Sequence, residues 1–255
     1  AIDRVQPAPT GFGPTFTRGV PGMGTLTVNT EVRDRNTTTY MPTLVYRHDG
    51  PKWKMEAGAG HSHSRDSTQS GDRGFFSTTS SRRTGVTISF DDVTAHRPGR
   101  VSVADGTNGA AIDPFDINTY VVATAQYTIP QNSDTKRSLY GNVRRDFDLR
   151  GTPLSLKAGF DLQNAIRDDT RSTSPFNVLF DFIGRDGAMS STPVRSDDLA
   201  APFFYDAIAT RPGVFGFPSI PVVSSTKLWQ HYQTNPAQFR ANENTTFRNS
   251  ILPNK

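Results

Sequence analysis

The sequence predicts an all-β fold: a partial antiparallel transmembrane β-barrel, built as a curved meander sheet, with long extracellular loops and one or two short loop helices. Apolar and polar residues alternate with a period of two along many segments, as in strands whose two faces meet different surroundings. Hydrophobic residues make up only 34% of the 255 residues, so a large conventional core is hard to build. Short turns alternate with long polar connections, which is typical of outer-membrane barrels.

Composition excludes several classes of protein. The net charge of +4 is small and its charges are scattered, so we expect no nucleic-acid partner. The chain has no cysteine, which excludes disulfides, cysteine-ligated metals and thiol catalysis. No run approaches the ~18 apolar residues of a membrane-spanning helix. The first ten residues lack the apolar stretch of a signal peptide.

The clearest pattern is a β-hairpin over residues 139–163. Alternate residues from Leu139 to Leu149 share an apolar face, and Leu154 to Leu162 repeat the pattern after a tight turn at residues 150–153. The opposite face is strongly polar. Arg145 breaks the apolar face, and we expect it either to reach the lipid headgroups or to mark a β-bulge.

Similar alternation predicts further strands and turns. The strands are expected at residues 24–33, 40–47, 53–60, 84–92, 101–103 and 119–127, with turns at residues 48–51 and 96–99. We expect these strands to form one curved sheet in which neighbours in sequence pair.

The longest connection is residues 168–242, which we place outside the cell with short helices near residues 197–205 and 226–234. Residues 24–167 then hold most strands, and residues 243–255 begin a further one. The whole chain, residues 1–255, would be one partial barrel domain. A soluble β-sandwich with one wet face accounts for the same alternation and stays open as an alternative.

Three sequence stretches carry a family resemblance. Residues 138–172 read SLYGNVRRDFDLRGTPLSLKAGFDLQNAIRDDTRS: a strand ending in RRDFDL, a short turn, then PLSLKAGFD and a polar exit. The others are FFYDAIATRPGVFGFPSIP and LWQHYQTNPAQFRANENTTFRNSI. Together they resemble the barrel of TonB-dependent receptors, which are outer-membrane transporters. The resemblance extends over roughly residues 38–251.

The resemblance implies more than the residues themselves show. Such receptors have ~22-stranded barrels and an N-terminal plug domain, whereas this sequence has no plug-like segment and no TonB box. It therefore implies an internal fragment of a receptor in the bacterial outer membrane. Its expected partners are outer-membrane lipid, the TonB energy-coupling complex and a scarce nutrient of unknown identity. The competing hypothesis is a soluble secreted β-sandwich that binds carbohydrate or acts in adhesion.

Candidate ligand-binding residues are aromatic and lie in the long connection. Exposed rings stack on sugars or peptides, but the same rings can form a small core that keeps a loop compact. The candidates are Phe203, Phe204, Tyr205, Phe215, Phe217 and Trp229, with Tyr232 nearby.

Two other groups of side chains have the chemistry of metal ligands. His61 and His63 share one face of a strand, as zinc ligands can, but no third ligand is identifiable. An acidic loop offers oxygen ligands for calcium at spacings that do not match an EF-hand; its residues are Asp105, Asn108, Asp113 and Asp116. We assign no catalytic, cofactor-binding or metal-binding residue, and expect no cofactor and no enzyme.

Overall fold

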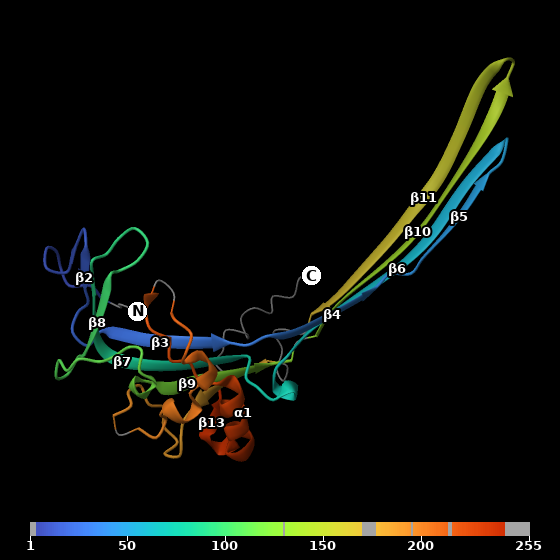
Figure 1. Ribbon diagram of the computed structural model, residues 1–255. Coiled ribbons are helices and arrows are strands. Elements are labelled where there is room, and N and C mark those ends of the chain that lie inside the picture. Colours follow the sequence, from blue (N-terminus) through green and yellow to red (C-terminus); the bar gives the residue numbers. More distant parts are fainter. Residues whose placement is uncertain (1–3, 130, 170–176, 195, 214–215, 243–255) are drawn as a thin grey trace. The chain divides into compact units, whose positions relative to one another are not determined.

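The computed structural model describes residues 4–129, 131–169, 177–194, 196–213 and 216–242. The chain divides into two compact units, each with its own antiparallel sheet (Figure 1). The first unit comprises Ala1–Arg33, Gln69–Thr128 and Asn177–Lys255, and the second comprises Asp34–Thr68 and Ile129–Phe176. None of the helices in the described residues has the length and apolar character needed to cross a membrane.

The sheet of the first unit is organised around strand β7 (Thr78–Asp91). Strands β3 (Gly24–Glu31) and β9 (Val121–Thr128) pair with its first part, and β2 (Phe16–Arg18) and β8 (Arg100–Asp105) pair with its end. The sheet continues from β9 through β12 (Asn177–Phe182) to β13 (Phe239–Ala241), and from β2 to β1 (Phe12–Gly13).

Short helices complete the first unit. Helix α1 (Ser225–Thr234) begins where the Ser224 hydroxyl accepts a hydrogen bond from the Lys227 amide at 3.3 Å. The described residues also form single 3-10 turns: η1 (Gly71–Arg73), η2 (Ile117–Thr119), η3 (Ala201–Phe203), η4 (Asp206–Ile208) and η6 (Pro236–Gln238).

The larger of two buried hydrophobic clusters in the first unit is rich in aromatic residues. Phe76 is fully buried, and its ring centre lies 5.1 Å from that of Trp229 on α1 and 5.9 Å from that of Phe239 on β13. Leu228 and Tyr232 extend the contact from the same helix. The helix therefore buries one side against the sheet, where aromatic rings supply large apolar area.

The second unit is a five-stranded sheet with three unusually long strands. Strands β6 (Trp53–Gln69), β10 (Gln131–Leu149) and β11 (Thr152–Asp169) contain 17, 19 and 18 residues. Strand β10 pairs with both β6 and β11. Strands β4 (Asp34–Tyr40) and β5 (Thr43–Asp49) both pair with β6.

The β10–β11 hairpin matches the prediction and is longer than expected. Its pairing runs without a bulge from Asn132 opposite Asp169 to Leu149 opposite Thr152. Arg150 and Gly151 form the two-residue turn with φ values of 55° and 83°, the backbone that the right-handed strand twist favours in tight hairpins. The predicted β5–β6 and β7–β8 hairpins and the helix near residues 226–234 are also confirmed.

The predicted single meander is wrong. β6 pairs with β10 rather than with β7, and the strands form two separate sheets. An alternating pattern specifies the face of the sheet on which each side chain lies. It does not specify which other strand pairs with the strand. The expected strand over residues 40–47 is interrupted at Met41 and Pro42, because proline cannot donate to the ladder.

The connection over residues 168–242 also differs from the loop that was expected. It contributes strands β12 and β13 to the first unit's sheet, and only a three-residue turn, η3, forms within residues 197–205. Pro202 limits helix extension there. The predicted strand over residues 243–255 lies outside the described residues.

Candidate functional site

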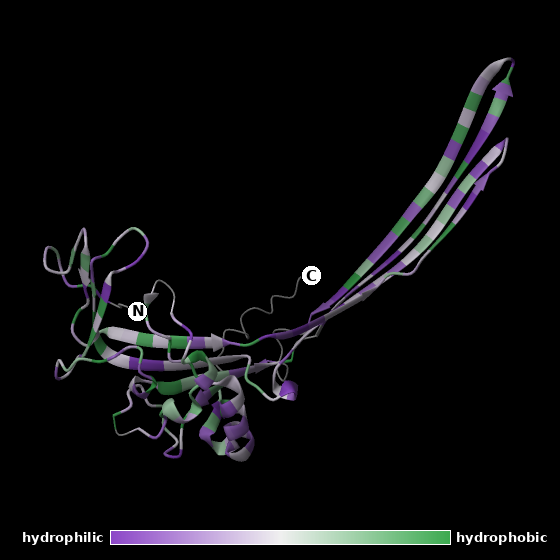
Figure 2. Cartoon of the chain, in the orientation of Figure 1, coloured by the Kyte–Doolittle hydropathy of each residue, from purple (hydrophilic) through white to green (hydrophobic). Residues whose placement is uncertain are grey.

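Hydrophilic and hydrophobic residues alternate along the long strands of the second unit (Figure 2). Because successive side chains of a strand point to opposite sides, this sheet has two chemically different faces. Leu139 lies opposite Leu162 on β11 and Ala59 on β6, and the next positions along each strand repeat this alternation. Side chains directly opposite in an antiparallel pair lie on the same face. The apolar face therefore holds, in addition, Leu44, Tyr46, Met55, Ala57, Val143, Phe147, Leu149, Leu154, Leu156, Ala158 and Phe160.

This apolar face is open among the described residues. Leu156 is 66% exposed and Phe160 is 53% exposed, and Leu139 and Leu154 are exposed as well. Val143 and Phe147 are half-buried by their neighbours on the sheet. The sequence predicts that all six of these side chains meet lipid, and four of them are exposed among the described residues. Contiguous apolar surface of this kind marks an interaction site.

Aromatic and basic side chains flank the apolar face at both ends. Near the β10–β11 turn, the Arg145 guanidinium lies over the rings of Trp53 and Phe147. At the other end, the Tyr40 ring centre lies 5.9 Å from that of His61 and 5.3 Å from that of His63. Amphipathic rings of this kind are enriched where an apolar layer meets water.

The histidine pair His61 and His63 is engaged in contacts other than metal binding. His63 Nδ1 lies 2.9 Å from Thr135 Oγ1 on β10, and both rings face Tyr40. Within the described ranges, no three His, Cys, Asp or Glu side chains are placed to share a metal ion.

The opposite face of the sheet is polar and hydrogen-bonded. Tyr140 Oη donates to Glu56 Oε1 at 2.9 Å, and its ring crosses Gly58, where an added Cβ would lie 2.3 Å from the ring. Glycine is therefore required for this close approach. Arg144 donates to Asp146 Oδ1 at 2.7 Å.

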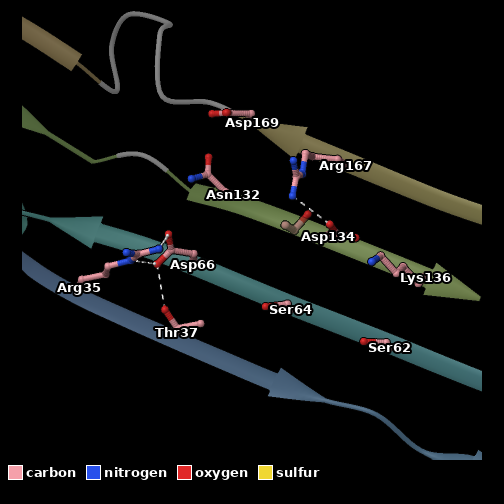
Figure 3. A pocket seen from close by; sticks show the side chains of 11 residues that line it. Arg35, Thr37, Ser62, Ser64, Asp66, Asn132, Asp134, Lys136, Arg167 and Asp169 are labelled. Atoms are coloured by element: carbon pink, nitrogen blue, oxygen red, sulfur yellow. Dashed lines mark hydrogen bonds and ion pairs between the residues drawn. The ribbon is translucent and has the colours of Figure 1, made fainter.

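A polar hollow of about 400 Å³ lies on this face near the far end of the sheet from the β10–β11 turn (Figure 3). Arg35 on β4 makes a two-point contact with Asp66 on β6, with Nε–Oδ1 and Nη2–Oδ2 distances of 2.8 and 2.9 Å. Thr37 Oγ1 donates to the same carboxylate at 3.0 Å. Charge-assisted pairs with two parallel hydrogen bonds hold their geometry well.

The other side of the hollow is formed by β10 and β11. Arg167 Nη2 lies 3.2 Å from Asp134 Oδ2, and the exposed Lys136 forms no ion pair within the described residues. Acidic and basic groups are balanced around the hollow, which suits hydrogen bonding to a polar solute rather than capture of an ion. The sequence does not predict this hollow, because four strands that are distant in sequence build it.

The aromatic ligand candidates lie in the first unit and differ in exposure. Phe203 is 8% exposed and Trp229 packs on Phe76, so both contribute to the core. Phe204 is half-buried, and Phe217 stacks on Phe115 with ring centres 6.0 Å apart. Tyr205 is the most accessible of them at 46%. Phe215 lies outside the described residues.

The acidic loop that offers oxygen ligands for calcium uses these oxygens in hydrogen bonds within its own turns. Asp105 Oδ1 accepts from the Thr107 amide at 2.9 Å, which lowers the pKa of Asp105, with a further contribution from Arg83. Asp113 and Asp116 accept from the amides of Phe115 and Asn118 in the same way. Asn108 Oδ1 accepts from the Ala110 amide. These are Asx turns, which order a loop without a ligand.

Comparison with protein-family models found no match to this chain, and comparison with curated proteins found none either.

Proposed function

We propose that this chain is part of the wall of a transmembrane β-barrel in a TonB-dependent outer-membrane receptor, which takes up a scarce nutrient with energy from the TonB complex. The single observation that carries the proposal is the uncovered apolar face of the second unit's sheet. The family resemblance of residues 138–172 supports it.

The dimensions of the apolar face suit a bilayer. From Leu139 to Leu149 the strand advances ten residues, or ~33 Å at ~3.3 Å per residue. Strands of membrane barrels tilt by ~35–45°, which reduces this length to a band ~25 Å tall. That is the height of the apolar band on such barrels.

The energetics favour lipid over water on this face. Burying apolar surface contributes roughly 25 cal/mol per Å², so a row of uncovered Leu and Phe side chains is costly in water. The opposite face carries Tyr140, Glu56 and Arg144 in hydrogen bonds, and these side chains suit a water-filled lumen.

The strands are also longer than a membrane requires. Strands of 17–19 residues exceed the ~9–11 needed to cross. If the Arg150–Gly151 turn is periplasmic, the excess length and the polar hollow project outside the cell on the lumen side. The hollow at Arg35, Asp66 and Lys136 is then positioned to contact solute entering the barrel.

The test uses the absence of native cysteine, which allows single labels. Phe160→Cys and Asp161→Cys place a fluorescent label on adjacent residues with opposite faces. The full chain is folded into vesicles containing brominated lipid, which quenches fluorophores in the acyl region. We expect strong quenching at position 160 and little at position 161.

The soluble β-sandwich hypothesis makes the contrary prediction. It requires the chain to remain monodisperse without detergent, with both labels unquenched by brominated lipid. Equal quenching at both positions would also contradict the facing proposed here.

A further inference from the structure

Another hollow of the second unit lies where the apolar face of its sheet ends. It has a volume of about 230 Å³ and is lined by Arg137, Ser138, Leu139, Leu162, Gln163 and Asn164. Leu139 lies opposite Leu162, and two residues further from the β10–β11 turn Arg137 lies opposite Asn164. Opposite residues, and every second residue along a strand, share one face. The apolar face and this polar pair therefore meet at the hollow.

The polar side of the hollow carries groups that donate hydrogen bonds. The side chains of Arg137 and Asn164 are exposed, and within the described residues Arg137 forms no ion pair. The arginine on the opposite face of β11 differs, because Arg167 Nη2 lies 3.2 Å from Asp134 Oδ2. The planar guanidinium of Arg137 thus keeps its donors for a group from outside the chain.

Positive charge predominates on this side of the sheet beyond the hollow. His61 on β6 lies opposite Arg137, and Arg65, four residues further along β6, is exposed and forms no ion pair within the described ranges. Across β6, β10 and β11, the rows from Arg137 to Arg65 hold one acidic residue on this side, Asp168, which lies opposite Ser133. Two guanidinium groups against one carboxylate favour an anionic partner.

In the barrel proposed above, the hollow lies at the boundary between acyl chains and headgroups. Leu139 and Leu162 belong to the last continuous apolar row, and Arg137 lies ~7 Å beyond them at ~3.3 Å per residue. The headgroup layer on each side of a bilayer is about 5–8 Å thick. A lipid seated there puts its phosphate beside Arg137 and Asn164 and its first acyl carbons against the two leucines.

We infer that this hollow binds the phosphate of an anionic membrane lipid, an inference that rests on the proposed function. The guanidinium of Arg137 presents two parallel N–H donors that match phosphate oxygens. The Asn164 side-chain amide supplies a further donor. The neighbouring basic residues attract the anionic headgroup. Free phosphate lacks the acyl chains that contact Leu139 and Leu162, so the occupant is the lipid.

The test measures which lipid lies beside the hollow. The full chain with Phe160→Cys carries a fluorophore on the same face, one row from Leu162 toward the β10–β11 turn. It is folded into phosphatidylcholine vesicles that contain a small fraction of either brominated phosphatidylglycerol or brominated phosphatidylcholine. Phosphatidylglycerol is anionic, whereas the choline ammonium compensates the phosphate charge. From the quenching we expect about a fivefold higher local concentration of the anionic tracer.

Variants separate the hollow from the general charge of the chain. Arg137→Gln should reduce the preference to about one, and quenching by brominated phosphatidylcholine shows that this variant still inserts. Lys136→Gln is the matched control, because it removes the same charge from the adjacent residue on the opposite face and should retain the preference. Inorganic phosphate added to the vesicles should leave the preference unchanged.

Four results would overturn the inference: equal quenching by the two tracers, a preference that survives Arg137→Gln, a preference lost in Lys136→Gln, or one abolished by inorganic phosphate. Equal quenching leaves the membrane proposal intact, because the label still lies among acyl chains. Quenching by neither tracer contradicts the membrane proposal and this inference together.

Discussion

Arg145 places its guanidinium over the ring of Trp53, with 4.8 Å between the guanidinium carbon and the ring centre. The same group lies 4.8 Å from the centre of the Phe147 ring. The pairing of β10 with β11 is continuous through this position, so no bulge moves Arg145 to the polar face. The cation stays on the apolar face because two π faces interact with it there.

Removing this contact should weaken the second unit. In a double-mutant cycle, Trp53→Ala and Arg145→Ala should show a coupling energy of ~0.5–1 kcal/mol in the free energy of unfolding. Denaturant unfolding measures it. Arg144→Ala is the matched control, since its side chain lies on the opposite face beside Asp146, and it should show no coupling with Trp53→Ala.

Substitution on the two faces should affect membrane insertion differently. Phe160→Arg should hinder insertion, because an arginine facing the bilayer midplane costs ~2–4 kcal/mol. Asp161→Asn changes the neighbouring residue on the polar face and should insert as the wild type does. Folding of each variant into vesicles, followed by a protease-protection assay, measures this. Equal insertion of both variants would show that the facing is reversed or absent.

Gly58 should be intolerant of a side chain. In Gly58→Ala the new Cβ would lie 2.3 Å from the Tyr140 ring, so the ring must move and its hydrogen bond to Glu56 is lost. We expect a loss of ~1–3 kcal/mol in unfolding free energy. Gly60→Ala meets only the Ser138 hydroxyl, a group that can rotate away, and should cost less.

Alanine substitutions at Phe203 and Tyr205 should distinguish an aromatic ring that packs in the core from one that is free to contact a ligand. Phe203→Ala opens a cavity in the core and should cost ~3–5 kcal/mol in unfolding free energy. Tyr205→Ala removes an exposed ring and should leave stability within ~0.5 kcal/mol of the wild type. Any ligand contact made by this set is therefore tested at Tyr205, where lost affinity is not confused with unfolding.

The stability of the first unit should fall as pH rises through the raised pKa of the buried Asp198. Burial raises the pKa of Asp198 above its ordinary value of 3.8, so its contribution to stability is complete below that value. That contribution is lost as pH rises through the raised pKa, because the folded state must then hold a buried charge. Thermal unfolding from pH 4 upward measures this decline. In Asp198→Asn the decline should be smaller.

Patterns among residues close in sequence are sufficient to predict several helices and strands. The alternation around Leu139 and Leu154, with Arg150–Gly151 between them, predicts the β10–β11 hairpin and its faces, because adjacent strands joined by a tight turn have one favourable register. The spacing of Leu228, Trp229 and Tyr232 predicts α1 for a similar reason. In each case the interacting residues are close in sequence.

Strand β12 was not predicted, because residues 177–182 read NVLFDF and do not alternate clearly. Its strand conformation depends on pairing with β9 and β13 and on burial of Phe180 and Phe182. The close approach of Asp198 to Gly184 depends on a similar return of the chain, since the two residues meet only after the segment between them folds back.

The two faces of the long strands follow from the sequence alone, since side chains alternate along any strand. Tertiary structure decided that β6 lies beside β10, and so placed Tyr140 over Gly58 and brought Arg35, Asp66 and Asp134 around one hollow. A strand whose residues alternate with a period of two can pair with any other strand that has the same alternation. The choice among partners is made by contacts between distant residues, which only the folded chain brings together.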